Sequence, residues 1–179
     1  MNGFPKIWSL GSPEVRDNLL KGEVEITEKV DGSQIWYGLD SNSKLLIRSK
    51  GAFIYKDDSY IREPDKLFKA AVEYIISIQA KLKPATSYYG EVISSKKHNT
   101  LTYTNVPRNN ILLYAVVHIG GYERHEELVK SADYLGFDTV ALLFQGVVTS
   151  HAELEAFMER ESALGGTKLE GLVIKNYNQ

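Results

Sequence analysis

Residues 23–39 constrain the fold most, because they predict two short strands joined by a tight turn. An alternating run at 23–26 precedes the turn, and an aromatic and β-branched run at 35–37 follows it. We expect Gly32 to adopt a positive φ in this turn and Asp31 to accept hydrogen bonds from nearby backbone amides. The turn also carries Lys29, whose amine could act as a nucleophile. The alternative is an ordinary Asp-Gly hairpin with a solvated lysine.

The other predicted elements alternate between helices and strands. Helices are predicted at 12–20, 64–82, 123–135 and 150–164, and further strands at 44–49, 87–93, 111–117, 140–144 and 169–175. This order predicts an α+β fold with a largely antiparallel sheet system. With 179 residues, we expect a single domain spanning 1–179.

Composition excludes several classes of function. The net charge is −2 and the pI is near 6.1, so binding to nucleic acid would require a local basic patch. The absence of cysteine excludes disulfides and thiolate chemistry, and we expect a cytoplasmic location. No apolar run reaches membrane-spanning length and the N-terminus lacks a signal-peptide pattern, so we expect no membrane partner.

Three predicted strands each carry a charged residue close to a glycine: Lys29 with Gly32, Glu91 with Gly90, and Glu170 with Gly171. Lys175 follows Glu170 by five positions, so the two would lie on opposite faces of a strand unless a bulge intervenes at Gly171. A glycine inside a strand, such as Gly90, also marks a bulge or the close approach of a ligand. Each charged residue alone could be a solvated side chain, but their combination favours a functional site.

These segments resemble the motifs of a known superfamily. Lys29-Val30-Asp31-Gly32, Tyr89-Gly90-Glu91 and Glu170-Gly171-Leu172-Val173-Ile174-Lys175 are similar to motifs I, III and IV of the covalent nucleotidyltransferases, which include DNA ligases, RNA ligases and mRNA capping enzymes. Arg48-Ser49 lies where this superfamily has motif Ia. The aromatic residue before Gly90-Glu91 resembles the nick-sealing RNA ligases of phages. The resemblance implies a nucleotidyltransferase (ATP-grasp-like) fold of antiparallel sheets flanked by helices.

The resemblance also implies a reaction. Lys29 would attack the α-phosphate of ATP to form lysyl-AMP, and the AMP would pass to an RNA 5′-phosphate for end joining. The implied catalytic residues are Lys29, Glu91, Glu170 and Lys175, of which Glu91 and Glu170 would also bind Mg²⁺. The implied nucleotide-binding residues are Glu28 (through its backbone), Asp31, Gly32, Arg48 and Tyr114. The expected partners are RNA ends with a 5′-phosphate and a 3′-OH, including those of a nicked duplex, and we expect a monomer.

Two departures from the family pattern keep alternatives open. Residues 113–118 lack the expected acid and their aromatic residue comes early, so either Tyr114 or Val116 would pack on adenine. The chain also ends at Gln179, before the Lys-x-Lys of motif V and without an OB-fold domain, which we interpret as a C-terminal truncation. The alternatives are a DNA ligase, a capping-type enzyme using GTP, or a non-catalytic module that binds a nucleotide or an RNA end.

A basic loop at 94–110 is open to two interpretations. Its polar and basic residues include Lys96, Lys97, His98, Tyr103 and Arg108. They could contact a polynucleotide near its reactive end, combining positive charge with an aromatic surface. The alternative is a solvated basic loop.

Overall fold

The computed structural model describes residues 5–16 and 18–177, which form two sheets with helices on their outer faces. The small sheet has the strand order β10 (Leu142–Val147), β1 (Glu23–Lys29), β11 (Gly171–Lys175). The large sheet has the order β5 (Ser59–Tyr60), β4 (Phe53–Lys56), β3 (Leu45–Ser49), β2 (Ser33–Leu39), β6 (Ser87–Val92), β7 (Ile111–His118), β8 (Gly121–Tyr122), and β9 (Asp138–Thr139) pairs in parallel with β7. All other pairings are antiparallel, so the predicted α+β class is confirmed.

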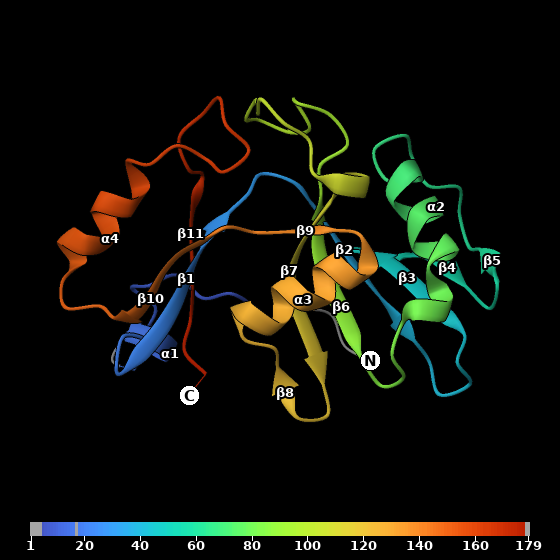
Figure 1. Cartoon of the computed structure of the whole chain (residues 1–179), viewed down its shortest axis with the longest axis horizontal. Helices are drawn as coiled ribbons and strands as arrows, with labels where there is room; N and C mark the ends of the chain where they lie inside the picture. The colour runs from blue at the N-terminus through green and yellow to red at the C-terminus, as the bar shows by residue number, and fades with distance from the viewer. Residues whose placement is uncertain (1–4, 17, 178–179) are drawn as a thin grey trace.

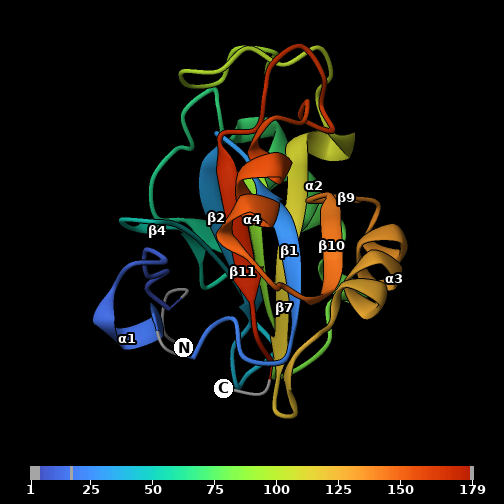
Figure 2. The same cartoon turned by 90° about the vertical axis from the view of Figure 1, so that its left-hand side faces the viewer.

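The helices leave the inner faces of the two sheets turned toward each other. Helices α2 (Lys69–Ser77) and α3 (His125–Leu135) pack on one face of the large sheet in a shared apolar core. Helix α4 (His151–Met158) packs against the small sheet through Leu154 and Phe157. Figure 1 shows α4 and α2 at opposite sides of the molecule with both sheets between them, and Figure 2 shows the small sheet in front of β2 and β7.

Helix α2 presents an apolar stripe to the large sheet. Ala71, Val72 and Ile75 of α2 are fully buried against Ile35 and Tyr37 of β2, within the largest apolar cluster. Trp36 lies between Ile35 and Tyr37 in β2 and therefore points to the inner face of the sheet. There it packs with neighbours from β3, β6 and β7. Strand alternation in β2 therefore separates an apolar outer face from an inner face that is free to line a site.

Several predicted boundaries were wrong because tertiary contacts override local pattern. The first helix, α1, covers only Pro13–Arg16, and residues 18–20 are turns rather than a continuation. The helix predicted at 64–82 contains α2 and a short 3₁₀ helix, η1 (Gln79–Lys81), and Asp65 accepts hydrogen bonds from the amides that precede α2. The helix predicted to reach 164 ends at Met158, although Ser150 caps it as expected. The predicted strand at 140–144 is displaced to β10 (Leu142–Val147).

Within residues 5–16 and 18–177, no helix is both long enough and apolar enough to span a lipid bilayer. A second 3₁₀ helix, η2 (Arg108–Asn110), precedes β7.

Candidate active site

A cavity of about 450 Å³ lies between the inner faces of the two sheets, at the end of β1 that carries Lys29. Nine residues were predicted for the site, and eight of them line this cavity: Glu28, Lys29, Asp31, Gly32, Glu91, Tyr114, Glu170 and Lys175. They come from β1 and its following turn, β6, β7 and the segment around β11. Residues far apart in the sequence are therefore brought to one cleft.

Lys29 forms an ion pair with Glu170 across this cleft, between residues 141 positions apart. Lys29 ends β1, whereas Glu170 lies one residue before β11 begins. The pairing of β1 with β11 runs without a register shift from Glu25 opposite Lys175 to Lys29 opposite Gly171. No bulge therefore occurs at Gly171. Glu170 lies before β11 begins, so the rule that side chains alternate between the two faces of a strand does not apply to it. Glu170 and Lys175 can therefore line the same cavity.

The side chain of Glu28 points away from the cavity. Its carboxylate is buried, and it accepts hydrogen bonds from the Ser162 hydroxyl and from the Ala163 amide at 3.0 Å. Its own amide donates to the carbonyl of Ala141 at 2.9 Å. Glu28 therefore anchors the loop at 159–168 to β1, and its backbone remains to line the cavity.

Asp31 fixes the turn after Lys29 to the loop at 94–104. Its Oδ2 accepts hydrogen bonds from the amides of Thr100 and Leu101, both at 2.7 Å, and its own amide donates to the Tyr103 hydroxyl at 2.8 Å. Burial alone would raise the pKa of Asp31, but these two amides, together with Asn99 and Lys29, outweigh burial and lower it. The expected bonding of Asp31 to backbone amides is thus confirmed, although the amides are distant in sequence.

Gly32 is required for close packing rather than for a left-handed conformation. Its φ is not positive, so that expectation was wrong. A Cβ at this position would lie 2.8 Å from the carbonyl oxygen of Val92 and 3.1 Å from the Cβ of Glu91. A glycine therefore allows the lysine-bearing turn to lie directly against β6.

Glu91 is a carboxyl group with a strongly perturbed environment. Burial is the main reason that its pKa rises to about 7, with Glu170 and Asp31 adding to the rise and Lys29 opposing it. Within the described part of the chain, no group of three or more His, Cys, Asp or Glu side chains could hold a metal ion. Glu91 and Glu170 could supply two carboxylate ligands, so the other oxygens around a divalent ion would have to come from phosphates or water.

A β-bulge aims Tyr114 into the cavity. Gly90 pairs with Leu113 and Tyr89 with Ala115, which leaves Tyr114 as the extra residue in β7. Its ring therefore lies on the inner face, and its hydroxyl accepts a hydrogen bond from Gln34 Nε2 at 2.6 Å. The predicted bulge beside Gly90 is confirmed. It also explains why the aromatic residue comes early in the sequence.

Val116 was the other residue expected to pack on adenine. It belongs to the apolar core beneath α2 and α3, on the outer face of the large sheet. That alternative was wrong, because the residue faces away from the cavity.

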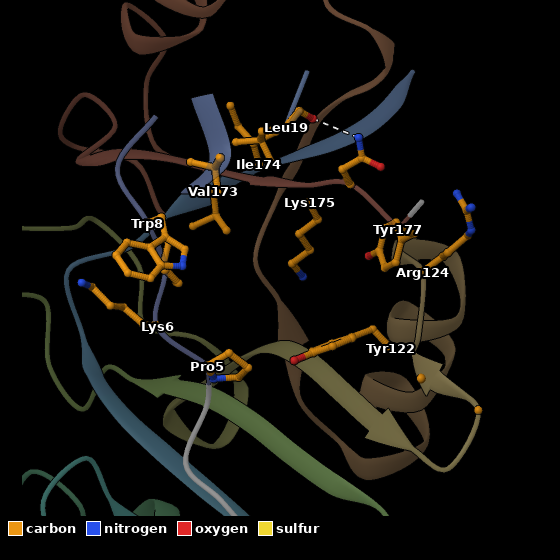
Figure 3. Close-up of a pocket in the computed structure, with 15 residues that line it drawn as sticks. Pro5, Lys6, Trp8, Leu19, Tyr122, Arg124, Val173, Ile174, Lys175 and Tyr177 are labelled. Atoms are coloured by element: carbon orange, nitrogen blue, oxygen red, sulfur yellow. Dashed lines mark hydrogen bonds between the residues drawn. The ribbon is translucent and has the colours of Figure 1, made fainter. Parts of the chain in front are cut away.

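Lys175 closes the far end of the cavity. Its Nζ donates a hydrogen bond to the carbonyl of Tyr114 at 2.6 Å. Burial lowers the pKa of Lys175 to about 8, although Glu25, which lies opposite it in β1, acts against this. Lys175 also lines an adjoining cavity of about 720 Å³, in which its side chain is seen to point toward Tyr122 (Figure 3).

Arg48 is the predicted residue that the structure does not bring to the cavity wall. It lies opposite Trp36 and therefore on the inner face of the large sheet. Its guanidinium lies over the ring of Phe53, with 5.3 Å between Cζ and the ring centroid. Arg48 thus shares the face that carries Glu91 but is not among the residues that line the cavity.

The loop at 94–110 is largely structural. His98 is buried and bonds to the Ser33 hydroxyl at 2.8 Å, and Tyr103 is buried against the turn that carries Asp31. Arg108 forms ion pairs with Asp133 and Asp138. His98 and Tyr103 are therefore buried and not available to a polynucleotide, whereas about half of the Arg108 side chain remains exposed beside its ion pairs. Lys96 and Lys97 remain exposed.

Several residues of the cavity wall were not among those predicted for the site. Gln34 donates a hydrogen bond to the Tyr114 hydroxyl. It could have been found from the sequence, because it lies two positions before Trp36 and therefore on the same face of β2. Ile7, Trp8 and Ser9 also line the cavity. They lie outside the predicted strands, so no periodicity marks them.

Comparisons with known proteins agree with this geometry. The sequence model of a protein family described as RNA ligase matches residues 22–179. Among solved structures, the Naegleria gruberi RNA ligase with pyrophosphate aligns with a TM-score of 0.63 at 19% identity, covering 90% of this chain and 48% of that one. An arginine-to-alanine mutant of that ligase with ATP and manganese aligns with a TM-score of 0.66 at 17% identity, covering 98% and 54%. A search of curated proteins finds no match. The chain thus spans about half the length of the ligase structures it matches, and the likeness establishes the shared fold.

Proposed function

The chain belongs to the RNA ligase family, and we propose that it is the adenylyltransferase unit of an ATP-dependent RNA ligase. The observation that carries this proposal is the position of Lys29. It stands at the edge of a cavity that is also lined by two carboxylates, Glu91 and Glu170, and by the partly buried Lys175. A nucleophilic amine, acidic groups for a divalent ion and a cation for phosphate are the components that nucleotidyl transfer requires.

In the proposed reaction, the Lys29 amine bonds to the α-phosphorus of ATP while the bond to pyrophosphate breaks. Lys29 pairs with Glu170, and a lysine ammonium must lose its proton before its nitrogen can attack. About half of the Lys29 side chain is exposed, so this proton can leave to solvent. Glu91 and Glu170 would hold a divalent ion, Mg²⁺ in this proposal, which neutralises phosphate charge and favours the neutral amine.

The second half of the reaction transfers AMP to the 5′-phosphate of an RNA, after which a 3′-OH displaces AMP and joins the ends. The Naegleria gruberi ligase structures contain ATP or AMP with manganese, which supports ATP and a divalent ion as the cofactors here. Lys96 and Lys97 are exposed beside the cavity-forming turn and could contact the RNA backbone.

Incubation with α-labelled ATP and Mg²⁺, followed by a denaturing gel, tests the first step. We expect label on the wild-type chain, no label on Lys29→Ala, and full label on the control Lys168→Ala, which removes an exposed lysine from an ion pair with Glu159. Label on Lys29→Ala would refute the proposed nucleophile. A wild-type chain that ATP stabilises thermally without becoming labelled would instead indicate a nucleotide-binding module.

A second assay follows AMP transfer from the labelled protein to 5′-phosphorylated RNA or DNA of the same sequence. Preference for RNA is expected. Equal transfer to DNA, or labelling by GTP in place of ATP, would favour a DNA ligase or a capping-type enzyme.

A further inference from the structure

The segment from Pro5 to Ser9 lies outside both sheets but forms part of the cavity wall. Ile7, Trp8 and Ser9 line the cavity that contains Lys29 and Glu91. Ile7 and Trp8 also line the adjoining cavity of about 720 Å³, as do Val173 and Lys175. Figure 3 shows the Trp8 indole beside Val173. Trp8 therefore stands at the boundary between the two cavities.

The register of β1 and β11 indicates which part of the cavity would receive the base. The α-phosphate must lie within bonding distance of Lys29, which is opposite Gly171. Strands advance about 3.3 Å per residue, so Val173 lies about 7 Å and Lys175 about 13 Å further along β11. A nucleotide that extends from Lys29 along this strand places its base near Val173, and this is where Trp8 lies.

Of the residues that line the nucleotide cavity, Trp8 and Tyr114 are the aromatic ones. Tyr114 is fixed within the sheet, because its hydroxyl bonds to Gln34 and its carbonyl accepts from Lys175. Trp8 belongs to a segment without regular secondary structure, and 38% of its surface is exposed. The Nζ of Lys6 lies 3.7 Å from the centroid of the Trp8 ring. This cation–π contact covers one face of the indole and adds positive charge close to the cavity.

We propose that Trp8 is the residue on which the base stacks, and that residues 6–9 close over the bound nucleotide. This inference rests on the proposed function, since it assumes that the cavity binds ATP. Stacking between a base and an aromatic side chain is sequence-tolerant and gains free energy from contact between two flat apolar surfaces. Loss of this contact should weaken ATP binding by about 10- to 100-fold.

The test compares Trp8→Ala and Trp8→Phe with the wild-type chain in the labelling assay, as a function of ATP concentration. We expect Trp8→Ala to raise the KM for ATP about 10- to 100-fold while saturating ATP restores the maximal rate, and Trp8→Phe to retain most of the affinity. Tyr134→Ala is the matched control, because Tyr134 is also an exposed aromatic residue beneath a lysine, Lys81, but lies on α3. It should leave the KM unchanged.

Fluorescence provides a readout that a purely structural role would not change. The chain has two tryptophans, so Trp36→Phe leaves Trp8 as the single emitter. ATP should quench this emission if the base stacks on the indole. Wild-type labelling with an unchanged KM in Trp8→Ala, or no quenching in Trp36→Phe when ATP stabilises that variant, would overturn the inference and leave the proposed function standing. A wild-type chain that neither binds nor is labelled by ATP would overturn both.

Discussion

Glu91 couples the stability of the protein to pH, and Glu91→Gln tests this coupling. The pKa of Glu91 is about 7 in the folded protein, against an ordinary value of 4.5, and burial is the main cause. As pH rises, Glu91 therefore loses its proton at a lower pH in the unfolded chain than in the folded protein. Above the folded pKa, the folded protein must hold an ionised Glu91 carboxylate in a poorly solvated position. The folded state loses stability between about pH 4.5 and pH 7, and this penalty is fully present above pH 7.

The magnitude follows from the size of the pKa difference. At about 1.4 kcal/mol for each pH unit, the difference corresponds to an upper value of about 3 kcal/mol. Glutamine has nearly the same shape and carries no charge, so Glu91→Gln should remove the penalty. We expect the variant to exceed wild type in unfolding free energy by about 2–3 kcal/mol at about pH 8, and to match it at about pH 4. For a chain of this size, that gain corresponds to an increase in melting temperature of about 5–10 °C.

Urea and thermal unfolding of both proteins at the two pH values provide the measurement. Glu155→Gln on α4 is the matched control, because it makes the same substitution at an exposed position. The stabilised Glu91→Gln variant should also lose labelling by ATP, since it lacks one of the two carboxylates proposed for the divalent ion. A difference between variant and wild type that does not change with pH would refute the reasoning about burial.

Three further substitutions test the turn and its supports by urea unfolding. Gly32→Ala should destabilise the fold by about 1–3 kcal/mol, because its Cβ would press on the carbonyl of Val92, whereas Gly11→Ala meets no atom within 4 Å and should be neutral. Asp31→Asn should lose about 1–2 kcal/mol at neutral pH by weakening charge-assisted hydrogen bonds. Since the pKa of Asp31 is lowered by folding, this loss should shrink as pH falls below the ordinary value of 3.8. Glu28→Gln should lower the unfolding free energy by about 2 kcal/mol, because a glutamine side chain has one acceptor oxygen and cannot replace both carboxylate oxygens as acceptors. An effect below about 0.5 kcal/mol at any of these three positions would contradict the role assigned to it.

The sequence predicted which residues lie together better than it predicted the element boundaries. Lys29, Glu91, Glu170 and Lys175 were expected together, and all four line one cavity. Their grouping could be anticipated because charged residues close to glycines recur on strands in a fixed order. Helix ends were less predictable, since the end of α4 and the bounds of α2 depend on contacts made by residues far away in the sequence.

Tyr114 illustrates what sequence patterns cannot supply. Alternation along β7 would place Leu112 and Tyr114 on one face and Ala115 on the other, but the bulge places Ala115 on the inner face as well. The extra residue is visible only in the pairing of two strands, and a single strand carries no sign of it beyond the glycine in its neighbour. The N-terminal segment presents the same difficulty, because Trp8 gains its position from the sheets it contacts.

The pairing of the small sheet also sets the order in which the protein can acquire its site. β1 lies between β10 and β11, so this strand has both of its partners far later in the sequence. Strands β2, β3 and β4 each pair with their successor, as β6 does with β7, and most of the large sheet can form from local contacts while translation continues. At about 5–20 residues per second, the strand that carries Lys29 must wait roughly 10–30 seconds for Glu170 and β11 to leave the ribosome. A nascent chain should therefore form most of the large sheet before the cavity that contains Lys29 and Glu170 can assemble.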